Sequence, residues 1–336
     1  MRIQSFLIVL LGFGALVGCR KVQLEPDPCD AGMYAAAKMR GACASETGQI
    51  LDFWPWFGMR SEWNCDWIAL VPQAYVSQGD PTLADTAWAA ELELLIARAH
   101  AFGLKVMVKP HVDVNRSTVH RGLYELDSEA EWAEFARQYE TWILTLAKVA
   151  RDQEAEMFCV GTELRSFVAA EPVFWSDLIE RVRMIFPGEL TYAANWDEYG
   201  EMPFWDRLDY IGVDGYFPLV DAALPEVDDL VVAWEGDRRG LHNMQRNYCK
   251  PVLFTEMGYR SADYAAWEHW KMSNPRINLS AQANAWEAWF RVFWAEDWIA
   301  GAFVWDWRSN RIDSYNNEWT PQGKPAGEVI ADWFGR

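Results

Sequence analysis

Eight short apolar runs, separated by stretches with helical periodicity, most limit how this chain of 336 residues can fold. Short apolar runs fit strands that are buried on both faces, as in a parallel sheet covered by helices. We predict strands at 40–45, 67–72, 105–109, 157–161, 190–194, 209–213, 251–255 and 300–304. We predict amphipathic helices at 83–101, 128–150, 173–186 and 280–296.

The alternation of these strands and helices indicates a (β/α)8 barrel, which we assign as a single catalytic domain over 33–336. An open, doubly wound sheet is the alternative. No glycine-rich phosphate loop follows the first predicted strand, which weakens that alternative. Ser128 followed by Glu131 forms a capping box at the start of one helix.

The N-terminus has a short basic start and an apolar run from Phe6 to Val17. This run is too short for a typical transmembrane helix and fits a secretory signal. It ends in LVGC (16–19), which resembles the bacterial lipoprotein cleavage box. The resemblance implies that residues 1–18 are a signal peptide, that Cys19 is lipidated, and that 19–32 form a tether. The alternative is an ordinary signal peptide with a chance cysteine.

Five cysteines follow Cys19 in the chain. An exported setting permits disulfides, and an odd number leaves at least one thiol free. Cys159 lies inside an apolar run and is predicted to be a buried small hydrophobe. The spacing of the cysteines matches no zinc pattern, and it leaves their connectivity open.

The charge balance and the tryptophans bear on the partner. The net charge is −19, from 30 Lys and Arg against 49 Asp and Glu, which argues against nucleic acid or anionic lipid and leaves a neutral polymer unaffected. The chain has 21 Trp, whose flat indoles suit stacking on sugar rings, although core packing is the default for any one of them. Trp305 and Trp307 share a strand face by alternation, so at least one is expected in a cleft.

Glu163 and Glu256 each directly follow an apolar run, within MFCVGTEL (157–164) and PVLFTEMG (251–258). In a (β/α)8 barrel the active site is built at the C-terminal ends of the strands. Two carboxylates in matched strand-end positions fit a retaining glycoside hydrolase, with one as general acid/base and one as nucleophile. The alternative for each is a hydrogen-bonded loop carboxylate.

Other strand ends carry polar and aromatic side chains that a closed barrel would bring to one mouth. The predicted substrate-binding residues are Lys109, His111, Asn195, Trp196, Asp214, Tyr216, Trp305 and Trp307. Together they supply the hydroxyl partners and the stacking surface that glycoside cleavage needs.

Three of these residues have other possible roles. His111 is alternatively a core histidine, or a metal ligand with Asp113 on the same strand face. No third ligand is evident, so we predict neither a metal nor a cofactor. Lys109 is alternatively a structural salt-bridge partner, and Asp214 alternatively braces a loop.

Seven segments resemble glycoside hydrolase family 113, in the retaining clan A, and the resemblance spans roughly 38–336. They are KVMVKPHVD (105–113), VGTELRS (160–166), NWDEY (195–199), PFWDRLDYIGVDGYFPL (203–219), KPVLFTEMGYRS (250–261), VWDW (304–307) and PQGKPA (321–326). The Glu163 and Glu256 segments, with the Tyr216 segment between them, are together fairly specific.

The resemblance implies β-1,4-mannan hydrolysis with retention, with Glu163 as acid/base and Glu256 as nucleophile. Thr162 stands where the clan usually has Asn, so the contact to the sugar 2-hydroxyl would come from elsewhere, with Asn195 as the candidate. Tyr216 would hydrogen-bond the nucleophile. Trp305 would form the floor of the cleavage subsite.

We therefore expect a lipid-anchored, monomeric β-mannanase of the bacterial cell envelope, which contacts the membrane only through its anchor. Arg20 after the lipidated cysteine does not favour retention in the inner membrane of a Gram-negative cell. Glu163 is expected to have a raised pKa and Glu256 to be ionised. The alternatives are another β-glycan such as glucan or xylan, or a non-catalytic carbohydrate-binding lipoprotein on the same barrel.

Overall fold

The computed structural model describes residue 29 and residues 37–44, 54–85, 88–114, 120–271, 273, 275–308 and 313–336. The predicted signal peptide, the predicted lipidation site Cys19 and the predicted tether other than Cys29 lie outside the described residues. Among the described residues, no helix is long and apolar enough to cross a membrane.

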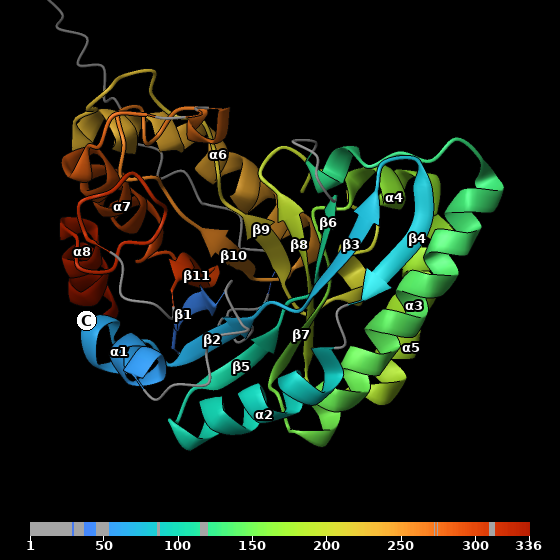
Figure 1. Cartoon of the computed structure of the whole chain (residues 1–336). Coiled ribbons are helices and arrows are strands. Elements are labelled where there is room, and N and C mark those ends of the chain that lie inside the picture. Colours follow the sequence, from blue (N-terminus) through green and yellow to red (C-terminus); the bar gives the residue numbers. More distant parts are fainter. Residues whose placement is uncertain are drawn as a thin grey trace, which may run out of the picture.

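Eight parallel strands close into a barrel, which confirms the predicted (β/α)8 fold (Figure 1). In the order in which they pair, the strands are β1 (Met39–Ala44), β11 (Ile299–Trp307), β10 (Val252–Met257), β9 (Ile211–Asp214), β8 (Glu189–Asn195), β7 (Met157–Thr162), β5 (Lys105–Val108) and β2 (Trp67–Leu70). All eight coincide with the predicted apolar runs. Each is buried because the barrel interior covers one face and helices cover the other.

The helices pack around the outside of the barrel (Figure 1). They are α1 (Trp54–Trp63), α2 (Trp88–Ala101), α3 (Glu129–Asp152), α4 (Arg165–Ala170), α5 (Pro172–Ile185), α6 (Val227–Tyr248), α7 (Leu279–Phe293) and α8 (Pro325–Phe334). Ser128 caps α3 as predicted, because its hydroxyl accepts a hydrogen bond from the Glu131 N–H. Short 3-10 turns in the described residues are η3 (Arg121–Leu123), η4 (Trp205–Arg207) and η5 (His269–Lys271).

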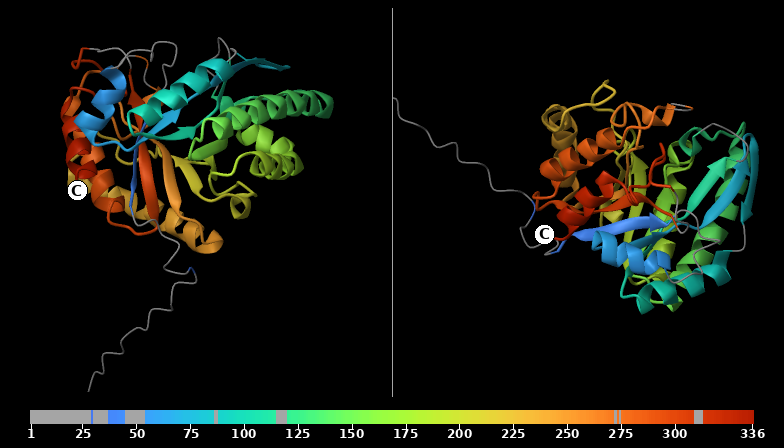
Figure 2. Two further views of the ribbon diagram at one scale, coloured as in Figure 1. Left: turned by 90° about the horizontal axis from the view of Figure 1, so that it is seen from below. Right: turned by 60° about the vertical axis from the view of Figure 1, so that its left-hand side comes forward.

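A small second sheet extends from the barrel, and the sequence analysis did not predict it. It consists of β3 (Gln73–Ser77), β4 (Asp80–Asp85) and β6 (His111–Val114) in the order β4-β3-β6 (Figure 2). Residues 83–85, predicted as the start of a helix, belong to β4, and α2 begins only at Trp88. Gln138 of α3 holds β4 by accepting from the Leu83 N–H at 3.0 Å.

The core has two parts. Inside the barrel, Cys43, Met107 and Phe303 pack in layers, and Gly41 leaves the space that the Phe303 ring fills. Between the strands and the helices lies a larger cluster that contains most of the buried tryptophans, such as Trp175 and Trp289. Core packing therefore accounts for many indoles, as expected by default.

Cys29 forms a disulfide with Cys249, with the two Cα atoms 5.1 Å apart. Cys43, Cys65 and Cys159 are free and buried, so the predicted leftover thiol and the burial of Cys159 are both confirmed. Cys249 ends α6 and precedes β10, so the disulfide lies at the N-terminal end of the strands.

Candidate active site

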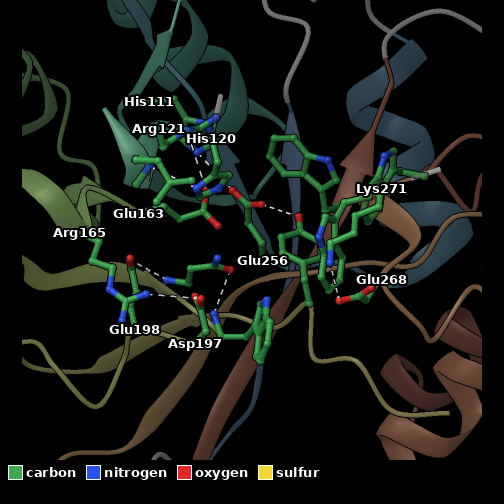
Figure 3. A pocket seen from close by; sticks show the side chains of 18 residues that line it. His111, His120, Arg121, Glu163, Arg165, Asp197, Glu198, Glu256, Glu268 and Lys271 are labelled. Carbon is green, nitrogen blue, oxygen red and sulfur yellow. Dashed lines mark hydrogen bonds and ion pairs between the residues drawn. The ribbon is translucent and has the colours of Figure 1, made fainter. Parts of the chain in front are cut away.

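The C-terminal ends of the barrel strands surround a pocket of about 530 Å³ (Figure 3). Seven of the ten predicted catalytic and substrate-binding residues line it: His111, Glu163, Asn195, Trp196, Tyr216, Glu256 and Trp305. A pocket of this size is typical of small-molecule and sugar sites. The closed barrel thus brings residues from the ends of five barrel strands to one cavity, together with His111 of β6.

Glu256 is held by donors on both of its carboxylate oxygens. Lys109 Nζ donates to Oε1, the His111 Nε2 atom is 3.2 Å from the same oxygen, and the Tyr216 hydroxyl donates to Oε2 at 2.5 Å. Between Phe254 and Glu256, β10 contains one more residue than the paired segment of β9. Such a bulge re-aims the following side chain, here toward the pocket.

Lys109 and Asp214, predicted as substrate-binding residues, are fully buried and are not among the residues that line the pocket. Both are 0% exposed, and the Lys109 Nζ is 3.3 Å from the Asp214 Oδ2. Burial lowers the pKa of Lys109, but the carboxylates of Asp214 and Glu256 outweigh it and raise that pKa. Lys109 is therefore a buried cation that faces the candidate nucleophile.

The charge of Lys109 sets the state of Glu256. Burial alone would raise the pKa of Glu256, but Lys109 and then His111 outweigh burial and lower it. Burial and the neighbouring Glu256 instead raise the pKa of Asp214 well above its usual range. Glu256 is thus the ionised member of the two carboxyl groups, as expected for a nucleophile.

His111 is a neutral hydrogen-bond donor in this network. The Arg121 Nη1 atom donates to Nδ1 at 2.7 Å, which leaves the ring proton on Nε2, toward Glu256. Burial, Arg121 and Lys109 lower the pKa of His111 to about 4. Asp113 pairs with the same Arg121 at 2.7 Å, so neither His111 nor Asp113 is available as a metal ligand. In the described part of the chain, no cluster of three or more His, Cys, Asp or Glu could hold a metal ion.

Glu163 directly follows β7 and has a left-handed backbone, with φ of 53°. Its N–H donates to the carbonyl of Ala193 at 2.8 Å, which holds the segment against β8. The His120 Nε2 lies 3.0 Å from Oε2, and the Arg121 Nε lies 3.9 Å from the same oxygen (Figure 3). The sequence analysis missed both of these partners, because they lie on η3 and at its N-cap rather than directly after a barrel strand.

The predicted direction of the Glu163 pKa is wrong for the free enzyme. Burial raises this pKa, but the charge and hydrogen bond of His120, followed by Arg121, outweigh burial and lower it. Another carboxyl group that lines the pocket, Glu198, has its pKa raised by burial to about 7. Glu198 accepts from the Asn195 N–H at 2.9 Å and lies within the NWDEY segment.

Trp305 lines the pocket, stacked on His111 with ring centroids 5.8 Å apart. Trp307 is 4% exposed and packs against Trp63 in the outer core, so its predicted place in the cleft is wrong. The four residues of β11 from Val304 to Trp307 lie opposite only three residues of β1, from Ala42 to Ala44. This bulge breaks the alternation on which the prediction depended.

Further aromatic residues extend the pocket wall. Trp196 lies next to Trp270, with centroids 6.1 Å apart, and Trp270 is 39% exposed. Trp319 packs edge-on against Tyr216 at 5.3 Å. Trp270 and Trp319 lie on long connections after β10 and β11, where no strand-end rule could single them out.

The chain is similar to known proteins of one enzyme family. A family model described as Glycoside Hydrolase Family 113 matches residues 58–324. No protein among those with curated descriptions matches the chain.

Several solved structures are similar to the chain. One is the family 113 β-mannanase AaManA from Alicyclobacillus acidocaldarius in complex with ManMIm, with 27% identity, a TM-score of 0.78, and coverage of 89% of this chain and 97% of that one. Another is a family 113 β-1,4-mannanase in a complex, with 25% identity, a TM-score of 0.78, and coverage of 89% and 99%. A β-glucuronidase from Ruminococcus gnavus shares the fold alone, with 13% identity, a TM-score of 0.58, and coverage of 89% and 50%.

Proposed function

The chain belongs to glycoside hydrolase family 113, and from this premise we propose that it cleaves β-1,4-linked mannan by double displacement with retention. Glu256 is the nucleophile and Glu163 the general acid/base. The observation that carries the proposal is the contrast between these two glutamates in one pocket. Glu256 is fixed on both carboxylate oxygens by Lys109, His111 and Tyr216, whereas the contacts of Glu163, with His120 and Arg121, all fall on one oxygen, Oε2.

In the first step, the Glu256 carboxylate attacks the anomeric carbon and forms an ester, while Glu163 gives its proton to the departing glycosidic oxygen. The ionised state that Lys109 imposes on Glu256 supports the attack. Trp305 lies beside His111 and provides a flat apolar surface for the sugar ring.

In the second step, Glu163 takes a proton from water, which attacks the anomeric carbon and releases Glu256. The pKa of Glu163 is lowered in the free enzyme, and the charge of Glu256 opposes that lowering. Ester formation removes that charge, so the pKa of Glu163 falls in the intermediate. This fall suits the change of Glu163 from acid to base.

Product analysis on β-mannan, glucomannan, xylan and cellulose tests the proposal. We expect manno-oligosaccharides as the main product, released first as the β-anomer. Release of xylo- or cello-oligosaccharides instead would show that the substrate is another β-glycan, xylan or glucan. Binding without turnover on every glycan would make the protein a carbohydrate-binding lipoprotein.

We further propose that the enzyme is lipid-anchored at Cys19 and exported to the bacterial cell envelope. The LVGC segment after the apolar run supports an anchor. The Cys29–Cys249 disulfide independently supports export, because disulfides persist in oxidising compartments.

A further inference from the structure

We propose that His120 is a positioning residue for the acid/base, which holds one carboxylate oxygen of Glu163 so that the other faces the glycosidic oxygen. The inference rests on the proposed roles of Glu163 and Glu256. It adds a residue that acts through Glu163 without itself contacting the reacting atoms.

The hydrogen bonds of the imidazole define its donor. The Gly122 N–H donates to the His120 Nδ1 at 3.2 Å, so this nitrogen is an acceptor. In the neutral imidazole the ring proton is therefore on Nε2, which lies 3.0 Å from the Glu163 Oε2 and donates to it whether His120 is neutral or protonated. Arg121, the nearest cation, approaches the same oxygen at 3.9 Å.

Both contacts fall on Oε2. Among the described residues, no side chain or backbone group hydrogen-bonds the Glu163 Oε1. One oxygen is thus held by His120, and the other is left for substrate. A proton on Oε1 needs no change in the His120 contact, because Oε2 accepts in either protonation state of Glu163.

The turn that carries His120 is docked onto the acid/base segment. The Ser166 hydroxyl donates to the Gly122 carbonyl at 2.8 Å. A Cβ atom at Gly122 would lie 3.1 Å from the Glu163 carbonyl oxygen, so the absence of a side chain allows close contact. The position of His120 is therefore set relative to Glu163 itself, as a positioning role requires.

The charged groups that face His120 come from three elements. They are Arg121 on η3, Glu163 after β7 and Glu198 after β8. Burial lowers the pKa of His120, but Glu163 outweighs it and raises that pKa. In return, His120 contributes to the lowered pKa of Glu163.

The test compares His120→Ala and His120→Gln with the wild type on mannotetraose and on 2,4-dinitrophenyl β-mannobioside. We expect His120→Ala to lower kcat/KM on mannotetraose by about 10- to 100-fold, the range for a hydrogen bond to a charged group. The dinitrophenyl leaving group needs no proton, so its kcat/KM should stay within about threefold. The glutamine amide can donate to Oε2, so His120→Gln should restore most of the rate.

A matched control is His100→Ala, because His100 pairs with Glu156 at 3.3 Å, outside the pocket. This variant should show no dependence on the leaving group. An equal loss on both substrates for His120→Ala, or no loss on either, would overturn the proposal, since a sugar contact or a loop anchor does not discriminate between leaving groups.

A titration that does not depend on turnover separates this inference from the proposed function. Loss of His120 removes a group that lowers the Glu163 pKa, so ¹³C NMR of the Glu163 carboxyl should show a higher pKa in both variants. The basic limb of kcat/KM on mannotetraose should move to higher pH accordingly. An unchanged Glu163 pKa would overturn the inference, whereas a normal shift with no activity on mannan would count against the proposed substrate alone.

Discussion

At the scale of single residues, two glutamates in one pocket are suited to different tasks because their neighbours differ. Glu256 faces a buried cation, Lys109, and a phenol, Tyr216. Glu163 faces His120, whose side chain is 45% exposed, so its proton equilibrium is open to solvent and substrate. Buried charge thus fixes the nucleophile, whereas a partly exposed partner keeps the acid/base adjustable.

Removing Lys109 should weaken the nucleophile in a pH-dependent way. Lys109 lowers the pKa of Glu256, so in Lys109→Met this pKa rises and less carboxylate is ionised at low pH. The acid limb of kcat/KM should move to higher pH, and maximal activity should fall by about 100-fold or more. Steady-state pH profiles on an aryl β-mannoside measure both changes.

The matched control is Lys105→Met, on the same strand but at its exposed end, where Lys105 lies over the Trp67 ring. It should leave the pH profile unchanged. An acid limb that stays in place in Lys109→Met, with the protein shown to be folded by circular dichroism, would contradict the role given to Lys109.

The two glutamates should fail in different ways when truncated. Glu163→Ala removes the proton donor, with a loss of roughly 10²–10⁴ that shrinks for activated aryl glycosides. Glu256→Ala removes the nucleophile, so no glycosyl-enzyme forms. With added azide, the Glu163 variant should give a β-glycosyl azide and the Glu256 variant an α-glycosyl azide, as read by NMR. If both variants gave the same anomer, the roles assigned to Glu163 and Glu256 would be wrong.

The sequence predicts which residues follow the strands, but not how deep they lie. Position after a buried strand correctly places Glu163, His111 and Tyr216 at one pocket. It misplaces Lys109 and Asp214 because alternation tells which way a side chain points and not which layer of the barrel it occupies. It misses His120 because a residue on a 3-10 turn carries no periodic signal.

At the scale of elements, an extra residue precedes functional side chains in three strands. Each of β7, β10 and β11 has one more residue than a paired neighbour near its C-terminal end. Bulges are common beside active sites because they redirect a side chain without breaking the sheet. A strict period of two in the sequence therefore fails at this end of the barrel, where function lies.

Trp305 and Trp307 lie on the same strand, β11, but Trp305 lines the pocket whereas Trp307 is buried in the core. Trp305→Ala should lower kcat/KM by roughly tenfold or more, since one stacking contact is worth about 1–1.5 kcal/mol. Trp307→Ala should instead cost about 3–5 kcal/mol of stability, because it empties a buried site beside Trp63. Chemical denaturation and kinetics on both variants check this. A loss of stability in Trp305→Ala and a loss of activity alone in Trp307→Ala would contradict the position of the β11 bulge.

The sheet β4-β3-β6 was not predictable because its strands lack a clear signal. β4 (DPTLAD) contains a proline and alternates weakly, and it runs directly into the helical pattern of α2. β6 follows β5 after only two residues and reads as its continuation. Tertiary pairing, not local preference, makes these segments strands.

At the scale of the whole molecule, the pocket and the Cys29–Cys249 disulfide lie at opposite ends of the barrel strands. The pocket lies at the C-terminal ends of the strands, whereas Cys29 is bound to Cys249 at their N-terminal ends. Between Cys19 and Cys29 the chain can span at most about 35 Å. A lipid on Cys19, as proposed, would therefore tether the barrel at the end that carries the disulfide, opposite the pocket.

This arrangement predicts that polymeric mannan can still reach the pocket when the enzyme is anchored to a membrane. A Cys19→Ser variant should appear in the soluble fraction, and the wild type in the membrane fraction with the mass of the lipidated form. Bound to vesicles, the wild type should hydrolyse polymeric mannan at a rate within about twofold of that of the soluble variant, because its pocket faces solvent.

Mannotetraose serves as the control, since a small substrate reaches the pocket in any orientation. Slow hydrolysis of the polymer alone on vesicles would mean that the pocket faces the membrane. An unmodified, soluble wild type would refute the proposed anchor. It would not affect the observation that the disulfide and the pocket lie at opposite ends of the strands.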